Sequence, residues 1–240
     1  MRPEGSAGEP SDMNERAAIL YLDLDGTLLD IREKYHRLHC RIALDLGRQP
    51  LPRGTFWARK RRGIALEGLL PGWDEAARAE YSRRWLAEIE LPLYTRFDRL
   101  VPGARESLLR LAPKFELVLV TLRRDGQELR RQLRRLGVGQ LFSRLLVRGD
   151  HVGAEFNKAE LVRLYPRDER ESVVVGDSEE DARGARALDS SFVAVLTGMR
   201  DRAFLAALGP DLIIDSVAQL PAVLLSPAAV NRGSLTVGSS

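Results

Sequence analysis

Apolar and polar residues follow two different patterns along this chain, and the pattern changes near residue 92. After that point, short apolar runs such as FELVLVTL and SVVVG alternate with stretches of helical length. Runs that are apolar at every position are typical of strands buried on both faces of a sheet. Strands that alternate with helices predict a parallel sheet covered by helices on both sides. We therefore expect an α/β core with a doubly wound, Rossmann-like parallel sheet.

The stretch between the first apolar run, AILYLDL, and residue 92 has a different pattern. Its apolar residues recur at helical spacing, for example Tyr35, Leu38 and Ile42. Asp74 stands where a capping residue would begin a helix over 74–90. We expect an all-helical cap domain that is inserted into the core after its first strand.

The individual elements follow from the same patterns. The expected strands are 18–24, 115–122, 145–147, 172–176, 192–196 and 211–215. The expected helices are 31–47, 55–62, 74–90, 103–112, 125–136, 157–165, 179–188, 201–208 and 216–225.

Two domains and two terminal segments are predicted from this order. We expect the α/β core over residues 17–30 and 93–225, and the helical cap over 31–92. The chain begins MRPEGSAGEPSD, which is rich in Gly, Pro, Glu and Ser and lacks an apolar stretch. Residues 1–16 are therefore expected to be a disordered lead and not a signal peptide. Residues 226–240 are expected to form a flexible tail.

Composition narrows the class of protein. The 240 residues include 37 Lys and Arg against 34 Asp and Glu, a net charge of +3. So small an excess does not indicate a nucleic-acid partner, because runs of charge are usually solvated faces. Cys40 is the single cysteine, so an intrachain disulfide is impossible and a reducing cytoplasm is expected. No apolar run reaches the length that a membrane span requires, and we expect no membrane partner.

Polar residues stand at the predicted ends of three core strands. Asp23 and Asp25 stand at the end of the first strand, Thr121 stands at the end of the strand 115–122, and Asp177 follows the strand 172–176. The carboxyl ends of parallel strands meet at one edge of a sheet, where ligands bind. Lys158, at the start of a predicted helix, would join them. Asp181 lies four residues after Asp177 and belongs to the same group.

Each of these features also has an ordinary structural interpretation. DGT can be a simple turn, and a strand can end at Thr121 without consequence. GDSEED makes a good helix N-terminus by itself, and Lys158 can be solvent-exposed. Clustered carboxylates, however, cost free energy unless a cation compensates them. Few, hard oxygen ligands favour Mg²⁺ over Zn²⁺. The group therefore predicts a magnesium site.

The four motifs together resemble the haloacid dehalogenase superfamily, in its phosphatase branch with a helical cap after the first strand. They are DLDGT (23–27), VT (120–121), Lys158 and GDSEED (176–181), and they occur in the order that the family has. The resemblance covers about residues 17–225. Any one motif is weak, whereas four in order are specific.

The resemblance implies a role for each acidic residue. Asp23 would be the nucleophile that accepts the phosphoryl group as an aspartyl phosphate. Asp25 would be the general acid for the leaving alcohol and then the base for water. The side chains of Asp23 and Asp177, with the backbone carbonyl of Asp25, would hold Mg²⁺. Asp181 would support these ligands.

The phosphate-binding residues also follow from the resemblance. Thr121 and the backbone N–H of Leu122 would cradle the phosphoryl group, while Lys158 neutralises its charge. Many relatives have Asn where this chain has Leu122. Arg123, next along, is a candidate for holding an anionic group, although a solvated helix start fits it equally well.

The acid at Asp25 favours phosphate-ester hydrolysis or phosphoryl transfer over dehalogenation, since a dehalogenase protonates no leaving alcohol. We expect a Mg²⁺-dependent phosphatase of the phosphoglycolate phosphatase type, acting on a small phosphorylated metabolite as a monomer or homodimer. A sugar phosphomutase and a catalytically silent binding scaffold are the alternatives. The scaffold is disfavoured because Asp23, Asp25, Lys158 and Asp177 are all present.

The predicted cap carries a basic segment, RGTFWARKRRGIALEG. Lys60 and Arg62 are candidates for binding the part of the substrate that does not react. An amphipathic helix with Phe56 and Trp57 in the core and the basic residues in water is the favoured interpretation. His36, His39 and Cys40 share helical spacing, and packing is favoured there over a metal site because a fourth ligand is not visible.

Overall fold

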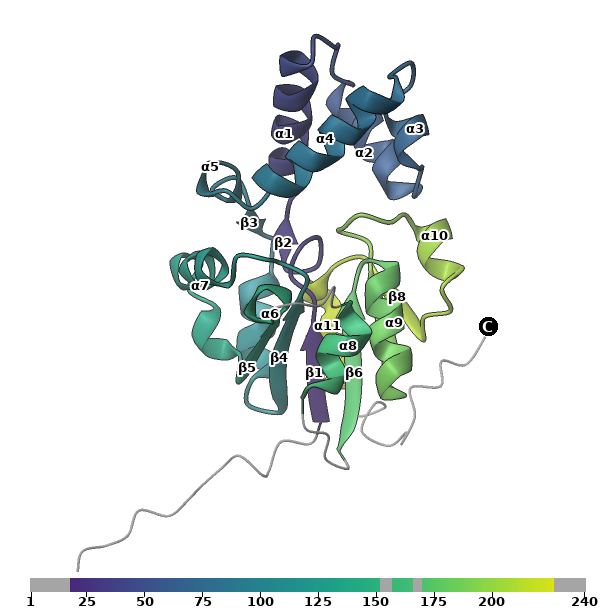
Figure 1. The fold of residues 1–240 in the computed structure, drawn as a ribbon. Coiled ribbons are helices and arrows are strands. Elements are labelled where there is room, and N and C mark those ends of the chain that lie inside the picture. The colour runs from purple at the N-terminus through teal and green to yellow at the C-terminus, as the bar shows by residue number, and fades with distance from the viewer. Residues whose placement is uncertain (1–17, 152–156, 166–169, 227–240) are drawn as a thin grey trace, which may run out of the picture.

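The computed structural model describes residues 18–151, 157–165 and 170–226. The predicted lead 1–16 and nearly all of the predicted tail 226–240 lie outside these ranges. Within them, six parallel strands form one sheet in the order β5-β4-β1-β6-β7-β8. Their bounds are β1 Ala18–Leu22, β4 Phe115–Thr121, β5 Arg144–Val147, β6 Glu171–Gly176, β7 Ser191–Val195 and β8 Leu212–Ile214. The predicted α/β doubly wound fold is confirmed (Figure 1).

Helices cover both faces of the sheet. Alternate residues of each strand point to opposite faces, and both sets are buried under these helices. Leu20, Leu22 and Leu119 pack with α6 (Ala104–Leu111), α7 (Gly126–Arg135) and α11 (Leu220–Leu224). Ile19 and Tyr21 pack on the other face with α8 (Lys158–Arg163), α9 (Glu179–Leu188) and α10 (Arg202–Ala206). β1 is a central strand of the sheet and is buried throughout. Its carboxyl end therefore lies in the middle of the sheet edge.

Four helices lie beyond the carboxyl ends of the strands, above the sheet in Figure 1. They are α1 (Arg32–Asp45), α2 (Arg53–Arg61), α3 (Leu66–Leu69) and α4 (Glu75–Glu88), and we call them the helical insertion. The insertion has its own apolar core, in which Leu38, Phe56 and Tyr81 are buried together. Asp74 accepts a hydrogen bond from the N–H of Ala77, so its predicted role as a helix cap is confirmed. The domain boundaries given above stay predictions.

A short antiparallel ribbon joins the insertion to the core. Strand β2 (Leu29–Asp30) leads into the insertion and β3 (Arg99–Leu100) leads out of it, with Leu29 opposite Leu100. The ribbon was not predicted, nor were α3 and α5 (Pro92–Thr95), because elements of two to four residues show no periodicity. The predicted helix 216–225 is two pieces, the 3₁₀ turn Val217–Gln219 and α11. Two further 3₁₀ turns, Gly139–Leu141 and Arg148–Asp150, flank β5.

Among the helices of the described ranges, none combines the length and the apolar character that crossing a membrane requires.

Candidate active site

The polar residues predicted at the strand ends line one pocket under the insertion. The pocket encloses about 640 Å³, including the part open to solvent. It is lined by the predicted residues Asp23, Asp25, Thr121, Leu122, Arg123, Lys158 and Asp177. Asp181 lies behind Lys158. The insertion and the loops facing it add Lys34, Tyr35, Ile89, Glu90, Ser178, Glu180 and Met199.

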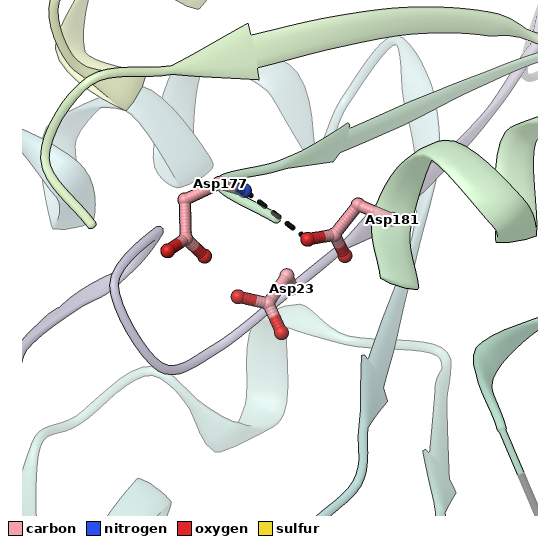
Figure 2. A group of neighbouring side chains, drawn as sticks. All are labelled: Asp23, Asp177 and Asp181. Carbon is pink, nitrogen blue, oxygen red and sulfur yellow. Dashed lines mark hydrogen bonds between the residues drawn. The ribbon is translucent and has the colours of Figure 1, made fainter. Parts of the chain in front are cut away.

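Asp23, Asp177 and Asp181 form one group of buried carboxylates, which we call the sheet-edge cluster (Figure 2). One carboxylate oxygen from each lies within 4.8 Å of the others. The ammonium of Lys158 contacts Asp23 and lies 2.5 Å from Asp181 Oδ1. Asp181 Oδ2 accepts hydrogen bonds from the backbone N–H groups of Asp177 and Ser178, both at 3.1 Å. Asp181 therefore orients Lys158 and also caps the start of α9.

Backbone geometry fixes the other two carboxylates. The N–H of Asp23 donates to the Val175 carbonyl at 3.0 Å, which continues the pairing of β1 with β6 by one residue. Asp177 accepts from the Thr27 hydroxyl at 3.3 Å and from the Met199 N–H at 2.5 Å. Gly26 has a φ of +95° and approaches Asp177 so closely that a Cβ there would lie 2.6 Å from Asp177 Oδ2. The turn DGT is thus required both by backbone conformation and by space.

The sheet-edge cluster is short of positive charge. Burial raises the pKa of Asp23 to about 6, although Lys158 opposes this effect. Burial, with the charges of Asp23 and Asp181, raises the pKa of Asp177 well above its usual range. Burial alone would lower the pKa of Lys158, but the Asp181 and Asp23 carboxylates raise it. Lys158 is thus a permanent cation facing three carboxylates.

A divalent cation fits this arrangement. Its charge would balance the carboxylates that Lys158 leaves uncompensated, and carboxylate oxygens are hard ligands of the kind that Mg²⁺ takes. Of the side chains in the described ranges, the three acids of the sheet-edge cluster are the one His/Cys/Asp/Glu group placed to share a metal ion. Neither Asp23 nor Asp177 serves as a helix cap, and Asp177 has no ion-pair partner among the described residues, whereas Asp181 is engaged by Lys158 on one oxygen and by the start of α9 on the other.

Asp25 belongs to a second cluster, on the side of the insertion, which contains Asp25, Asp98, Lys34 and Arg123. We call it the insertion-side cluster. Arg123 donates to both carboxylate oxygens of Asp25, at 2.5 and 2.7 Å, and to Asp98 at 3.0 Å. Lys34, from α1, donates to Asp98 at 2.8 Å and to Asp25 at 3.1 Å. Gln132 adds a hydrogen bond to Asp98 at 2.9 Å.

Charge is balanced in the insertion-side cluster, with two cations against two carboxylates. The side chains of Lys34, Arg123 and Asp98 are buried, with 1%, 5% and 0% of their surface exposed. Burial alone would raise the pKa of Asp25, but Arg123 and Lys34 lower it well below its usual range. The pKa of Arg123 is raised by the same carboxylates, although burial opposes the rise. Asp25 is thus held ionised in the ligand-free structure.

Asp23 and Asp25 both lie beyond β1, which already ends at Leu22, and not in the predicted strand 18–24 or at its last position. Their carboxylates lie in different clusters. Arg123 was a candidate for binding an anionic group of the substrate. It instead donates hydrogen bonds to Asp25 and Asp98. Thr121 is buried at the end of β4, where its hydroxyl accepts from the N–H of Arg123 at 3.3 Å.

The two basic candidates of the insertion lie away from the pocket lining. Lys60 Nζ lies over the rings of Trp85 and Tyr35, at 5.1 and 5.8 Å, and burial lowers its pKa to about 8. Arg62 is exposed. The neighbouring Arg61, which the sequence did not single out, donates to the carbonyls of Leu196 and Arg200 in the core.

The histidine and cysteine group of α1 is explained by packing. His39 stacks on Phe56 with ring centroids 4.4 Å apart and hydrogen-bonds the Tyr81 hydroxyl and the Leu51 N–H. Both of its ring nitrogens are occupied. Cys40 lies beside His36, with Sγ 3.5 Å from the ring.

Lys34, Asp98 and Gln132 belong to the candidate site through their hydrogen bonds, and sequence reasoning missed them. Lys34 has the sequence context of a solvated helix lysine, and Asp98 that of a loop acid. Residues 34 and 98 are far apart in the sequence and lie on either side of the ribbon β2–β3. Local patterns therefore carry no signal for them.

Comparisons with known proteins agree with this geometry. A family model described as haloacid dehalogenase-like hydrolase matches residues 18–189. A plasmid-encoded phosphoglycolate phosphatase of Cupriavidus necator is 30% identical over 228 residues, which are 87% of this chain and 95% of that protein. A phosphoglycolate phosphatase of Synechococcus elongatus is 26% identical, over 85% of this chain and 94% of that protein.

Solved structures have the same fold. A haloacid dehalogenase-like family hydrolase of Streptococcus pneumoniae superposes with a TM-score of 0.69 at 21% identity, over 88% of this chain and 100% of that chain. A haloacid dehalogenase superfamily hydrolase of Geobacter sulfurreducens gives 0.60 at 20% identity, over 89% and 99%. The fold and the comparisons together define a hydrolase of phosphate esters, a phosphatase. The chain belongs to the haloacid dehalogenase-like hydrolase family.

Proposed function

We propose that the protein is a Mg²⁺-dependent phosphatase that hydrolyses a small phosphorylated metabolite through an aspartyl phosphate on Asp23. The observation that carries the proposal is the sheet-edge cluster, in which one lysine faces three buried carboxylates at the end of β1. Bound Mg²⁺ would be held by the side chains of Asp23 and Asp177 with the Asp25 carbonyl, and would supply positive charge to the phosphoryl oxygens.

The chemistry takes place in two steps. An oxygen of Asp23 attacks phosphorus, the bond from phosphorus to the leaving oxygen breaks, and Asp25 gives that oxygen a proton. In the second step Asp25 takes a proton from water, whose oxygen attacks the phosphorus of the aspartyl phosphate. Inorganic phosphate and free Asp23 result.

Asp25 must change protonation between the two steps. Arg123 and Lys34 favour its ionised form, which is the form that the second step needs as a base. A phosphoryl dianion beside Asp25 acts in the opposite direction and raises its proton affinity for the first step. The hydrogen bonds from Arg123 and Lys34 hold the Asp25 carboxylate in place during both steps.

The transferred group is held on its other side by residues at the end of β4 and the start of α8. The Thr121 hydroxyl and the backbone N–H of Leu122 would donate to phosphoryl oxygens, and Lys158 would neutralise their charge. The pocket lining supports this, since all three residues face the space beside Asp23.

The helical insertion is proposed to act as a cap over residues 31–92 that closes the pocket and selects the substrate. Tyr35 and Ile89, which line the pocket from the insertion, support this role. The names of the relatives make 2-phosphoglycolate the first substrate to test. The single cysteine supports a cytoplasmic location.

The proposal is tested with p-nitrophenyl phosphate, with and without Mg²⁺. We expect Mg²⁺-dependent release of nitrophenol, and a loss of at least about 10³-fold in Asp23→Asn because the nucleophile is gone. Asp215→Asn is the matched control, since Asp215 is exposed and remote from the pocket. Equal release by Asp23→Asn and the wild type would refute the proposal. A strict requirement for a sugar bisphosphate would favour the mutase instead.

A further inference from the structure

The pocket has a leaving-group side, which is the side where Asp25 would deliver its proton. This side is lined by Asp25, Arg123 and the insertion residues Lys34, Tyr35, Ile89 and Glu90. Whatever group a substrate carries beyond its phosphate must lie against these six side chains. Their charges and hydrogen bonds therefore determine which leaving groups fit.

Both cations on this side are already engaged. Arg123 and Lys34 each contact Asp25 and Asp98, and Asp98 is fully buried between them. An anionic leaving group that approaches either cation must compete with the two carboxylates that already neutralise its charge. Leaving a buried carboxylate with too little positive charge costs several kcal/mol.

The remaining residues add no positive charge. Tyr35 and Ile89 present an aromatic ring and an aliphatic side chain. Glu90 is an acid whose Oε2 accepts from the N–H groups of Arg124 and Asp125, both at 2.8 Å. The whole lining contains three cations, Lys34, Arg123 and Lys158, against five carboxylates. Lys158 is engaged by Asp23 and Asp181.

The basic segment of α2 does not supply the missing charge within the described structure. Arg59 donates to the Gly68 carbonyl and Arg61 to carbonyls of the core. Lys60 lies behind the ring of Tyr35, over Trp85. The basic composition of the insertion therefore does not make its pocket wall basic.

We propose that the pocket selects phosphate monoesters of uncharged alcohols over esters whose leaving group is anionic, and that Asp98 sets this preference by occupying Lys34 and Arg123. The inference rests on the proposed phosphatase function and deepens it. A carboxylate on the leaving group would be desolvated beside Asp25 and Glu90 without a cation of its own. A hydroxyl group of similar size carries no such penalty.

The test compares two esters of nearly equal size. 2-Phosphoglycolate ends in a carboxylate, and 2-hydroxyethyl phosphate ends in a hydroxyl group. We expect kcat/KM for the hydroxyl ester to be at least about tenfold higher, which corresponds to about 1.4 kcal/mol. Each ester is also measured as a competitor of p-nitrophenyl phosphate, so that the two are ranked even where turnover is slow. Equal or better use of 2-phosphoglycolate, in rate or in competition, overturns the proposal.

Asp98→Asn tests the residue assigned to the preference. The amide has the shape of the carboxylate but no charge, so Lys34 and Arg123 would gain a free positive charge. We expect the ratio of kcat/KM values to shift about tenfold toward 2-phosphoglycolate, with no shift in Asp215→Asn. A folded Asp98→Asn protein with the wild-type ratio would show that Asp98 does not set the preference.

Lys34→Gln provides the test if Asp98→Asn fails to fold. It removes a cation while Arg123 still pairs with Asp98. We expect the preference for the hydroxyl ester to persist or increase, whereas a selective loss of 2-phosphoglycolate hydrolysis would mean that Lys34 binds the substrate carboxylate and would overturn the proposal. Hydrolysis of p-nitrophenyl phosphate by the same preparations distinguishes failure of the proposed function from failure of this inference. If it is absent, the proposed function fails, and if it is present while 2-phosphoglycolate is preferred, only this inference fails.

Discussion

Two carboxylate clusters lie side by side at the end of β1, and they handle buried charge in opposite ways. The sheet-edge cluster has three acids and one lysine, so it is left with uncompensated negative charge. The insertion-side cluster has two acids and two cations within 3.1 Å, so it is balanced. A cluster short of positive charge is suited to bind a cation, whereas a balanced cluster is suited to hold its members in place.

Asp23 and Asp25 show this contrast within three residues of one loop. The pKa of Asp23 is raised to about 6, and that of Asp25 is lowered well below its usual range. Both carboxylates are removed from water, so burial acts in the same direction on both. The charges in contact decide the difference, because Asp23 has one cation and the Asp181 carboxylate beside it, whereas Asp25 has two cations. Identical side chains can therefore take different chemical roles because of their neighbours alone.

Replacing one acid in each cluster by its amide should have the largest effects on the free energy of unfolding, and the effects should differ between the clusters. Asp98→Asn leaves Lys34 and Arg123 with a single carboxylate, and we expect the free energy of unfolding to fall by about 3 kcal/mol. Urea denaturation of the metal-free protein measures it. Asp215→Asn, on an exposed ion pair, should change it by less than about 0.5 kcal/mol. Unchanged stability of Asp98→Asn would mean that the cluster is not balanced as described.

Asp177→Asn should change the free energy of unfolding of the metal-free protein in the opposite direction. It removes a buried carboxylate that has no ion-pair partner among the described residues, so we expect the metal-free protein to become more stable by about 1 kcal/mol. The same change should weaken the apparent affinity for Mg²⁺ by at least about tenfold, since it removes a proposed ligand. Thermal unfolding over a Mg²⁺ titration measures both. A variant that is less stable without metal and still responds fully to Mg²⁺ would contradict the prediction.

The two clusters were also unequally predictable from the sequence. Asp23, Asp177 and Lys158 stand at the ends of elements whose apolar patterns are clear, so the topology of a parallel sheet brings them to one edge. Short-range rules therefore sufficed for the sheet-edge cluster and for the six strands. They also sufficed for the long helices of the insertion.

The insertion-side cluster depends on tertiary structure. Lys34 lies on α1, Asp98 in the segment before β3, and Arg123 in the loop after β4. No periodicity relates these positions, and the ribbon that aligns the first two has only two residues in each strand. Arg123 was named as a candidate for an anion, but its actual partners are acids of the protein itself. The sequence gives residue types, whereas the pairing of charges requires the fold.

A pH titration sharpens the contrast between Asp23 and Asp25 in metal-free protein. The pKa of Asp23 rises from 3.8 to about 6 on folding, so between these values the folded chain binds more protons than the unfolded chain. Its contribution to stability is therefore lost as the pH rises through this window, at up to about 1.4 kcal/mol per pH unit. The pKa of Asp25 is lowered, so its contribution is full above pH 3.8 and is lost as the pH falls below it.

Carboxyl ¹³C resonances of the two residues measure these pKa values directly. We expect the Asp23 resonance to move with a midpoint near pH 6, while the Asp25 resonance stays at its ionised position through that range. Asp23→Asn should reduce the loss of stability between pH 4 and 6, while Asp177, whose pKa is also raised, keeps its own contribution. Two resonances that move together would show that the clusters share one electrostatic environment.

The smallest expected effect concerns how the insertion is held over the two clusters. Lys34 attaches it on the side of Asp25, and Arg61 attaches it on the other side through the carbonyls of Leu196 and Arg200, in the loop that also holds Asp177 through Met199. We expect Arg61→Met to lower the free energy of unfolding by about 1 kcal/mol and to increase amide hydrogen exchange in α2, because these hydrogen bonds are lost. The exposed neighbour Arg62 is the matched control, and Arg62→Met should leave both measurements within about 0.5 kcal/mol of the wild type. If the two variants behave alike, the Arg61 side chain does not help to hold the insertion over the pocket.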